Sequence, residues 1–404
     1  MFVQNQLSAW MAGVRQQIAL PLRIELWNGQ HLDFSNEAPR VTIRLPQASA
    51  ARYLLTPSLS NLGTAYVEGN IEVHGAARDM IAVVNALARS TLKEEGRFAR
   101  IARNFGHNRK HDAEAIRYHY DVSNEFYAQF LDPNMVYSCA YFENGDEDLA
   151  TAQIKKIDHI LAKIRLQPGQ TLLDIGCGWG ALVLRAAQQY GARCVGITLS
   201  ENQYALAQQR VREAGLEHLI DIRLQDYRDV RGQFDRITSV GMFEHVGRKH
   251  LPEYFRTIHN LLSDEGVAMN HGITSTDPEN GETPYGGGEF IDKYVFPQGE
   301  LVHLSLVLKS MQEGGLEAYD VENLRRHYAR TCSEWTDNFE ANAEPIKKLA
   351  GDKRFRIWHV YLAGCVYGFE QDLISLYQIV CSKSGRHPRA LPWSRNYIYQ
   401  DRPA

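Results

Sequence analysis

Hydrophobic and polar residues follow a strand-and-helix alternation through the second half of the chain. A helical pattern over residues 153–164 ends at Pro168-Gly169, and short apolar runs then alternate with amphipathic stretches. The expected strands are 171–175, 193–198, 220–224, 234–240, 266–271 and 374–381, and the expected helices include 181–190 and 201–214. This alternation predicts an α/β fold with a doubly wound, Rossmann-like sheet.

The first hundred residues show a different pattern. Residues 22–26 and 41–45 alternate between apolar and polar positions, Asn28-Gly29 is a hairpin signal, and residues 66–73 resemble a further pair of strands. Residues 77–88 then place apolar side chains on one helical face. Because 404 residues exceed one compact core, we expect two domains. The first is a small α+β domain over 1–105. The second, over 106–404, is the α/β domain.

Residues 89–111 connect the two expected domains and are strongly basic. Arg97, Arg100 and Arg103 alternate with apolar residues at near-helical spacing. This pattern is typical of an amphipathic helix that lies on an anionic membrane surface. A solvated linker helix that packs its apolar side on a neighbouring domain explains the pattern equally well.

Composition limits the kind of function. The chain has 44% apolar and 23% charged residues and a formal net charge of -4, which gives no overall attraction to nucleic acid or anionic lipid. Its six cysteines include no Cys-x-x-Cys pair, so we expect neither a metal site nor a disulfide framework. No apolar run is long enough to span a bilayer, and the N-terminus lacks the features of a signal peptide. These observations predict a cytoplasmic enzyme, and any membrane contact must come from a local patch.

Three glycines at alternate positions follow the first strand of the expected sheet. Residues 172–180 read Leu-Leu-Asp-Ile-Gly-Cys-Gly-Trp-Gly, and a helical pattern starts directly after them. A glycine turn between a strand and a helix brings bare backbone close to a bound nucleotide. The Gly-x-Gly-x-Gly spacing differs from that of dinucleotide sites and fits an S-adenosylmethionine site better.

Polar side chains follow the next two strands, at the edge where such a sheet binds its ligand. Thr198 and Gln203 can bond the sugar and amino-acid groups of the cofactor, and Ser200 suits the N-cap of the next helix. Asp226 can accept a hydrogen bond from the adenine amino group, and Tyr227 can pack against the adenine ring. We therefore expect these residues to contact the cofactor.

An acid and an imidazole follow the fourth and fifth strands. Glu244 comes just after 234–240, and His271 ends 266–271. Together, at neighbouring strand ends, they indicate proton transfer. A lone histidine after a strand is more often a structural hydrogen-bonding group, so the prediction depends on their proximity.

An aromatic-rich stretch over residues 115–142 precedes the sheet. It contains His-Tyr-Asp-Val-Ser-Asn at 119–124 and Tyr-Ser-Cys-Ala-Tyr-Phe at 137–142. We expect it to fold over the cofactor as a lid and to line an apolar tunnel. Simple hydrophobic packing would explain the rings but not the Tyr-Ser-Cys turn.

These motifs occur in one order, with Gly-Ile-Thr-Leu-Ser-x-x-Gln at 196–203 and Phe-Glu-His-Val-Gly at 243–247. The set resembles the cyclopropane-fatty-acyl-phospholipid synthase family and its mycolic acid relatives, over residues 110–385. The resemblance implies transfer of a methylene group from S-adenosylmethionine to the cis double bond of an unsaturated phospholipid acyl chain. It also implies that 106–404 is a catalytic domain with an aromatic lid (110–145) and an acyl-chain cover (275–345). It further implies a homodimer that is peripheral to the inner face of the membrane.

The resemblance further implies the residues of the site. The matching cofactor contacts are Tyr137, Ser138, Asp174, Gly176, Gly178, Gly180, Thr198, Leu199, Ser200, Gln203, Asp226 and Tyr227. The family holds a bicarbonate ion as catalytic base, and the matching residues are Cys139, Glu244, His271, Ile273 and Tyr328. Cys365 matches a cysteine once proposed as the family's nucleophile. It also lies on an apolar helical face, and we favour a core role for it.

A bound anion suits the implied reaction better than a side-chain base. Methyl transfer to an alkene leaves a carbocation, which could alkylate a carboxylate or thiolate, whereas bicarbonate is a weak nucleophile. An ionised Glu244 would repel that anion. Glu244 must therefore be protonated, act through water or bond the bicarbonate OH, and a charged His271 would help. Two other functions stay open: a lipid methyltransferase that yields a methyl- or methylene-branched chain, and a lipid-binding protein with an inactive methyltransferase fold. The intact glycine loop argues against the second.

Overall fold

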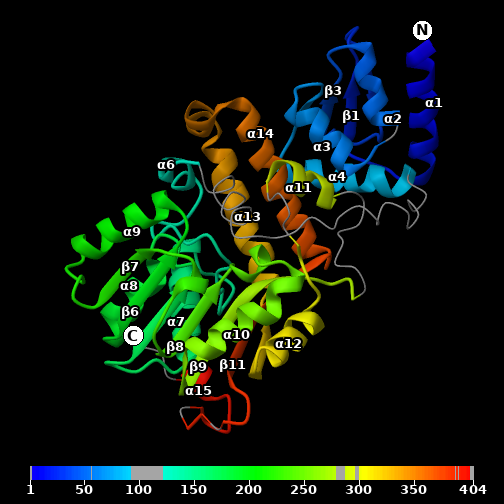
Figure 1. Ribbon diagram of the computed structural model, residues 1–404. Coiled ribbons are helices and arrows are strands. Elements are labelled where there is room, and N and C mark those ends of the chain that lie inside the picture. Colours follow the sequence, from blue (N-terminus) through cyan, green and yellow to red (C-terminus); the bar gives the residue numbers. More distant parts are fainter. Residues whose placement is uncertain are drawn as a thin grey trace. The chain divides into compact units, whose positions relative to one another are not determined.

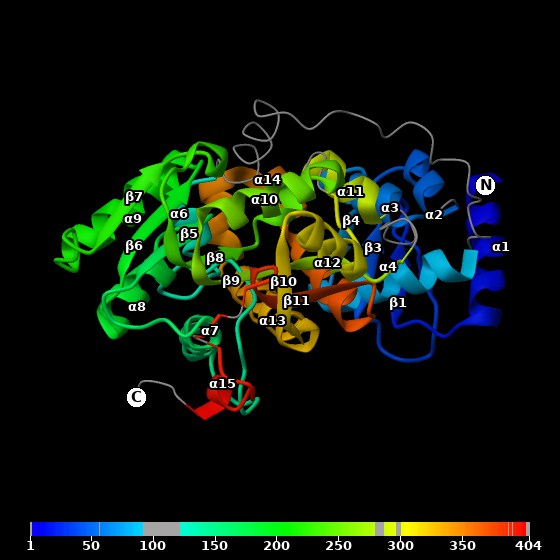
Figure 2. The ribbon, with the colours of Figure 1, turned by 60° about the horizontal axis from the view of Figure 1, so that its bottom comes forward.

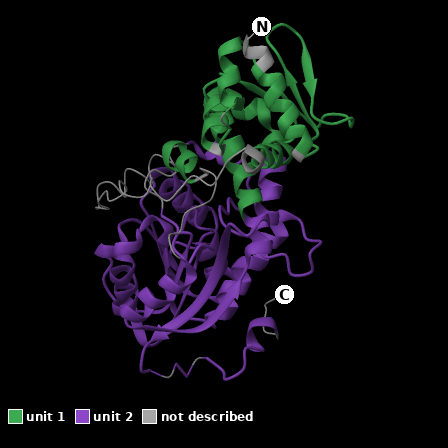
Figure 3. Cartoon of the chain, turned by 90° about the vertical axis from the view of Figure 1, so that its right-hand side faces the viewer, with its two compact units in different colours: residues 1–106, 283–297, 339–368 green, residues 107–282, 298–338, 369–404 purple. Residues whose placement is uncertain are grey.

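The computed structural model describes residues 2–55, 57–91, 122–278, 287–295, 300–386, 388, 389 and 391–400 (Figure 1). Two compact units divide the chain (Figure 3). Unit 1 comprises residues 1–106, 283–297 and 339–368, and unit 2 comprises residues 107–282, 298–338 and 369–404. The basic connector from residue 92 on, with Arg97, Arg100 and Arg103, lies outside the described residues, as does the His-Tyr-Asp motif at 119–121.

The two units interrupt each other in sequence, which differs from the contiguous boundary expected at residue 105. Residues 287–294 form a helix that packs on residues 59–67 of unit 1, where the Phe290 ring approaches Gly63. Val360 packs against the same unit's apolar core. These apolar contacts are distant in sequence, so a pattern that is read along the chain does not reveal them.

Unit 1 is a small α+β unit. Its elements are α1 (Phe2–Gln17), β1 (Leu22–Glu25), β2 (His31–Asp33), β3 (Val41–Arg44), η1 (Ala48–Ala51), α2 (Arg52–Leu55), α3 (Leu59–Val67), β4 (Glu72–His74), α4 (Ala77–Thr91), α11 (Gly287–Tyr294) and most of α14 (Ala343–Glu370). The strand order is β2-β1-β3-β4, and β1 and β2 form the antiparallel hairpin predicted at Asn28-Gly29. Of the strand pair expected over 66–73, the second strand is confirmed as β4, and the first was wrong. Residues 59–67 are helical, since Ser58 caps them and Leu62, Ala65 and Tyr66 face the core.

Unit 2 contains the doubly wound sheet that the sequence predicts (Figure 2). Its strands are β5 (Thr171–Ile175), β6 (Arg193–Thr198), β7 (Ile220–Leu224), β8 (Phe234–Val240), β9 (Leu262–Ser275), β10 (Leu316–Asn323) and β11 (Ile374–Lys383), in the order β10-β11-β9-β8-β5-β6-β7. Strands β5 to β9 are parallel, and β11 runs antiparallel to both β9 and β10. The carboxyl ends of the parallel strands therefore meet at one edge of the sheet.

Helices of unit 2 cover both faces of this sheet. Helices α7 (Leu149–Lys163), α8 (Ala181–Tyr190) and α9 (Glu201–Glu213) contribute to one apolar cluster with Leu172, Met269 and Val380. Helices α10 (Leu251–Leu261) and α12 (Leu304–Glu313) contribute to a second cluster with Leu173 and Ile379. Because alternate residues of a strand face opposite sides, each strand supplies both cores.

The remaining helices are short or join the two units. Those within unit 2 are α6 (Asn124–Tyr127), η3 (Tyr227–Asp229), η4 (Phe243–His245), η5 (Arg248–His250) and α15 (Tyr397–Gln400). Helix α13 (Arg325–Ala341) begins in unit 2 and ends in unit 1. None of the described helices is long and apolar enough to cross a membrane.

Candidate active site

The glycine turn lies between β5 and α8, as predicted. Gly176, Gly178 and Gly180 all have positive φ (83°, 54° and 86°), a conformation that side chains other than glycine rarely adopt. A Cβ on Gly178 would meet no protein atom within 4 Å. Gly178 is therefore required by the backbone conformation, and its outer side is open to a ligand. Asp174, at the end of β5, is buried and accepts a hydrogen bond of 2.7 Å from Thr238 Oγ1.

The segment after β6 is held by its own polar side chains. Thr198 Oγ1 donates to Gln203 Oε1 at 2.8 Å. Ser200 Oγ accepts from the backbone N–H of Gln203 at 3.3 Å, which confirms Ser200 as the N-cap of α9. This segment is thus a rigid rim directly beside the glycine turn, since Gly176 and Cys177 donate their backbone N–H to Ile197 O.

Asp226 and Tyr227 form the third part of the same edge, after β7. The Asp226 carboxylate accepts from Arg228 three times, from its backbone N–H and from its guanidinium, at 2.7 to 2.9 Å. The Tyr227 ring packs edge-on against Tyr254 at 5.4 Å. Asp226 is thus fixed in place by Arg228, a partner that its spacing in the sequence did not suggest.

The aromatic segment packs on the glycine turn. The ring of Tyr127, which ends α6, lies 5.0 Å from that of Trp179 in the turn and 5.5 Å from that of Tyr137. Trp179 Nε1 donates to Asn124 Oδ1 at 2.7 Å. Tyr137 also lies 5.1 Å from Trp335 of α13. The described part of the predicted lid therefore contacts the predicted cofactor loop.

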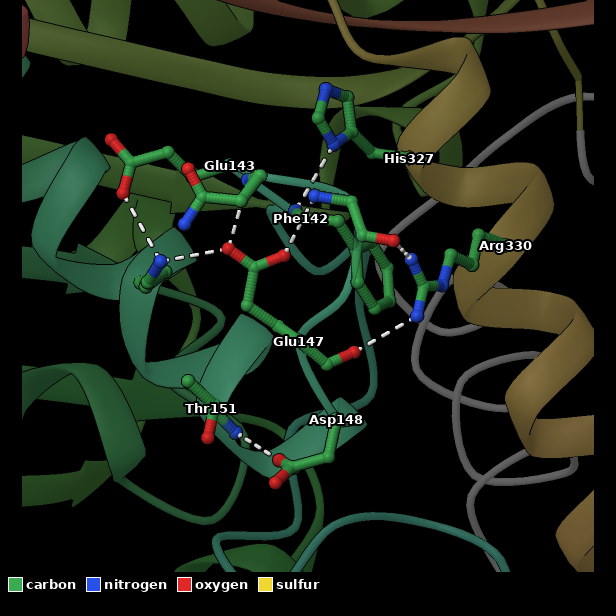
Figure 4. Close-up of polar contacts among 10 residues, drawn as sticks. Phe142, Glu143, Glu147, Asp148, Thr151, His327 and Arg330 are labelled. Carbon is green, nitrogen blue, oxygen red and sulfur yellow. Dashed lines mark hydrogen bonds and ion pairs between the residues drawn. The ribbon is translucent and has the colours of Figure 1, made fainter.

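The loop after the Tyr-Ser-Cys turn is tied down on two sides (Figure 4). Arg330 of α13 donates to the carbonyls of Gly145 and Glu147, and the backbone N–H of Phe142 donates to His327 Nδ1 at 3.1 Å. Burial opposes ionisation of Glu147, but Lys155 at 2.7 Å and backbone donors lower its pKa to about 2. These contacts anchor the segment that carries residues 137–139.

Glu244 and Ile273 are brought together at the ends of β8 and β9. Glu244 Oε1 accepts from the backbone N–H of Ile273 at 2.7 Å. Burial raises the pKa of Glu244 to about 7, and its Oε2 has no hydrogen-bond partner among the described residues. The neighbouring Phe243 ring lies so close to Gly272 that a Cβ there would be 1.9 Å from Cε1. Gly272 thus allows η4 to approach β9.

His271 lies beside this pair on β9 and is fully buried. Its Nδ1 is 3.2 Å from Gln378 Nε2, and its Nε2 has no partner within the described part of the chain. Burial, helped by the positive charges of Lys156 and Lys163, lowers the pKa of His271 well below its usual range. The imidazole is therefore neutral, so the charged His271 that we considered is disfavoured. A protonated Glu244, which would not repel an anion, is therefore the simpler explanation of how this site could bind one.

Cys139 is completely buried, and burial raises the pKa of its thiol. Its Sγ is 3.2 Å from Ala140 O. Tyr328 lies on α13, where its ring packs on Phe369 and Trp335. Cys365 lies on α14 in unit 1 and is only partly buried, whereas the other predicted catalytic residues belong to unit 2.

Two further polar residues, Gln153 and Lys156, were not predicted. Lys156 Nζ donates to Ser138 Oγ at 2.8 Å, and Gln153 Nε2 donates to Ser138 O at 2.8 Å. Burial lowers the pKa of Lys156 to about 8, against the opposing charges of Cys139, Asp132 and Asp174. The signal was present, because both residues lie on the apolar face of the predicted helix. A buried lysine needs a partner or a function.

Comparisons with known proteins agree with this geometry. The family described as mycolic acid cyclopropane synthetase matches residues 107–379, and a domain of unknown function, DUF7884, matches residues 9–96. A probable fatty acid methyltransferase of Pseudomonas putida is 45% identical over 390 residues, which cover 95% of this chain and 98% of that protein. The cyclopropane-fatty-acyl-phospholipid synthase of Escherichia coli is 38% identical over 265 residues, 66% of each chain.

A solved structure extends the likeness to three dimensions. The crystal structure of the mycolic acid cyclopropane synthase CmaA1, complexed with SAH and CTAB, has a TM-score of 0.64 and 36% identity. It covers 67% of this chain and 98% of CmaA1. The residues that the family matches, 107–379, contain the glycine turn and the strand ends described above.

Proposed function

Because the chain belongs to the mycolic acid cyclopropane synthetase family of S-adenosylmethionine-dependent methyltransferases, we propose that it cyclopropanates unsaturated phospholipid acyl chains with bicarbonate as base. The observation that carries this proposal is the pair of buried polar atoms, Glu244 Oε2 and His271 Nε2, that lack partners among the described residues. Glu244 follows β8, and His271 on the adjacent strand β9 pairs with Val240, the last residue of β8, at the cofactor edge of the sheet. Two buried hydrogen-bonding groups of this kind require a polar ligand.

The donor set fits a small oxyanion. Glu244, whose pKa is about 7, is partly protonated at neutral pH and can then donate through Oε2, while the neutral imidazole of His271 can donate through Nε2. The backbone N–H of Ile273 is already bonded to Glu244 Oε1, so Ile273 acts by fixing that carboxyl group. The charge of Lys156 further favours an anion on this side of the sheet.

Each residue then has a limited chemical task. S-adenosylmethionine, when bound, supplies the methyl group, and bicarbonate supplies a weakly nucleophilic base. The residues of the site hold that base beside the new methyl group, so that loss of one proton lets the ring close. The buried, un-ionised thiol of Cys139 offers no competing nucleophile. The apolar lid and its rings keep water away from a carbocation and stabilise positive charge.

A lipid methyltransferase that makes a branched chain is the second candidate. The relative that is similar over 95% of this chain is named a probable fatty acid methyltransferase, and only the fate of the cation separates the two products. Since acyl chains reside in the bilayer, either reaction implies contact with a membrane surface, and we propose a peripheral homodimer.

One experiment separates these functions. Purified protein is incubated with labelled S-adenosylmethionine and vesicles of an unsaturated phospholipid, and the fatty acids are analysed by mass before and after hydrogenation. Cyclopropanation gives a gain of one CH2 per double bond that resists hydrogenation, whereas a methylene branch has the same mass and is reduced. Turnover should fall in buffer freed of carbon dioxide and return when bicarbonate is added. Incorporation without a ring favours the second candidate, and turnover that ignores bicarbonate contradicts the proposed base.

A further inference from the structure

The partner of His271 lies directly opposite it in the sheet. Strands β9 and β11 are antiparallel, and their register pairs His271 with Gln378. The next pairs on the same face are Met269 with Val380 and Ile273 with Leu376, which are apolar. Gln378 is fully buried, as is His271. A polar pair thus interrupts an apolar ladder, and it does so beside the predicted base.

The contact between the two side chains fixes where the imidazole carries its proton. Gln378 Nε2 lies 3.2 Å from His271 Nδ1. With this orientation of the amide, in which Gln378 Oε1 has no partner among the described residues, Nε2 donates and Nδ1 accepts with its lone pair. In a neutral ring, the single proton is then on Nε2. The environment keeps the ring neutral, because burial and the charges of Lys156 and Lys163 lower the pKa of His271.

The tautomer decides whether the site can hold an anion. With the proton on Nε2, the ring presents an N–H group at the atom that lacks a partner among the described residues. With the proton on Nδ1, the ring would present a lone pair there, which would repel an anionic base. We propose that Gln378 is a positioning residue: its amide holds His271 in the Nε2–H tautomer, so that His271 donates to the anionic base. This inference rests on the function proposed above.

The first test is made on the unaltered, full-length protein without any ligand. Two-bond proton–nitrogen correlation spectra of protein labelled with nitrogen-15 histidine show which ring nitrogen is protonated, and comparison with His271→Asn identifies the signal. We expect a neutral ring with its proton on Nε2. A proton on Nδ1, or a charged ring at neutral pH, would overturn the proposal, whatever the activity of the variants.

The second test reverses the tautomer. Gln378→Glu has nearly the same shape, and its carboxylate accepts from Nδ1–H, which leaves a lone pair on Nε2. We expect turnover to fall by roughly 10²–10⁴-fold, as for a catalytic histidine held in the wrong tautomer. Binding of S-adenosylmethionine, measured by calorimetry, should be retained. Gln209→Glu on the exposed surface of α9 is the matched control and should leave turnover unchanged.

A milder variant guards against misfolding. Gln378→Met removes the donor without adding a charge, so both tautomers become accessible and turnover should fall less than in Gln378→Glu. If the spectra of either variant show that the proton has left Nε2 of His271 and the variant still turns over at the wild-type rate, the proposal is contradicted. The spectra are recorded without bicarbonate. They therefore test whether Gln378 sets the tautomer of His271 even if turnover of the parent enzyme does not depend on bicarbonate. The tautomer proposal and the proposed base can thus fail separately.

Discussion

The two faces of the unit 2 sheet use neighbouring residues of the same strands for opposite purposes. Towards α10 and α12 the strands present Leu173, Ile237 and Ile379, which belong to a continuous apolar cluster. One residue away on each strand, the face towards α7 presents polar groups. These are Asp174, Thr238 and Gln378, all buried.

Burying these polar groups is unfavourable unless they are paired. Asp174 bonds Thr238, and Gln378 bonds His271. Helix α7 adds a buried lysine, Lys156, to the same face. A fold that needed only stability would place apolar residues here, as it does one residue away. Both faces carry an apolar cluster, and the comparison indicates that the face towards α7 also gives up some stability for chemistry.

The strongest test of this division compares one variant from each face. His271→Ala should reduce turnover by about 10²–10⁴-fold, because it removes a group that holds the base. Its free energy of unfolding should also fall, by about 1–3 kcal/mol, because Gln378 is left buried without its partner. Ile379→Ala should lower the free energy of unfolding by about 2–5 kcal/mol, since Ile379 is 1% exposed, with turnover per folded molecule largely kept.

Chemical denaturation and steady-state kinetics on both variants decide the matter. If His271→Ala unfolded the protein as readily as Ile379→Ala, or if Ile379→Ala lost turnover while folded, the functional difference between the faces would be wrong.

Lys156 gives the next largest effect. Lys156→Met removes the charged hydrogen bond to Ser138, a predicted cofactor contact, and should weaken S-adenosylmethionine binding by about 10–100-fold, from 1.5–3 kcal/mol for such a bond. The variant should nevertheless be more stable at neutral pH. A lysine whose pKa falls from 10.5 to about 8 on folding costs on the order of 3 kcal/mol below pH 8.

The pH dependence has a definite sign. Folding lowers the pKa of Lys156, so the parent protein gains stability as the pH rises from about 8 to 10.5, and cofactor affinity declines as the lysine loses its proton. Calorimetry and urea unfolding across this range measure both. Lys309→Met is the control, because Lys309 is 69% exposed, makes a surface ion pair with Glu313 on α12 and should affect cofactor binding little. Loss of stability with unchanged affinity would make Lys156 a structural residue.

The folding stability that depends on Glu244 should change with pH in the opposite direction, falling as the pH rises. Burial raises its pKa from 4.5 to about 7, so the folded protein holds a proton that the unfolded chain releases. The stability that this proton gives is fully present below pH 4.5 and is lost as the pH rises through 7. Glu244→Gln should therefore equal the parent near pH 4 and exceed it by about 2–3 kcal/mol at pH 8.

Urea unfolding at the two pH values measures this difference. Glu253→Gln is a suitable control, because the Glu253 side chain is 70% exposed. A Glu244→Gln difference that does not depend on pH would mean that folding does not raise the pKa of Glu244.

Much of this architecture could be predicted from periodicity. Strands β5, β6, β7 and β8 and helix α8 lie within the predicted bounds, because each has a clear apolar pattern and a glycine or a polar cap at its end. The strand expected before Gly69-Asn70 was wrong, because these two residues resemble a hairpin signal, while the helix before them depends on packing against the core of unit 1. The strand after them is present as β4.

The site was predictable only where function follows a strand end. Glu244 and His271 were found because the carboxyl edge of a parallel sheet is where ligands bind. Gln378 and Lys156 were missed, since the first is identified by an antiparallel register across 107 residues and the second by the burial of one helix face. Long-range pairing of this kind is invisible in a single sequence.

Cys139 should give the smallest effect, although it lies in the Tyr-Ser-Cys turn. Its thiol is un-ionised because burial raises its pKa, and it points towards Ala140 O at 3.2 Å. Cys139→Ser keeps a small donor at this position, so turnover should fall by less than about tenfold, well below the loss expected for a missing base. Cys332→Ser is a useful control, because that cysteine is equally buried on α13. Steady-state kinetics with and without bicarbonate would compare the two variants. A nucleophilic cysteine does not survive exchange for serine, so an inactive Cys139→Ser variant that folds and binds S-adenosylmethionine would favour a thiolate mechanism over the bound anion.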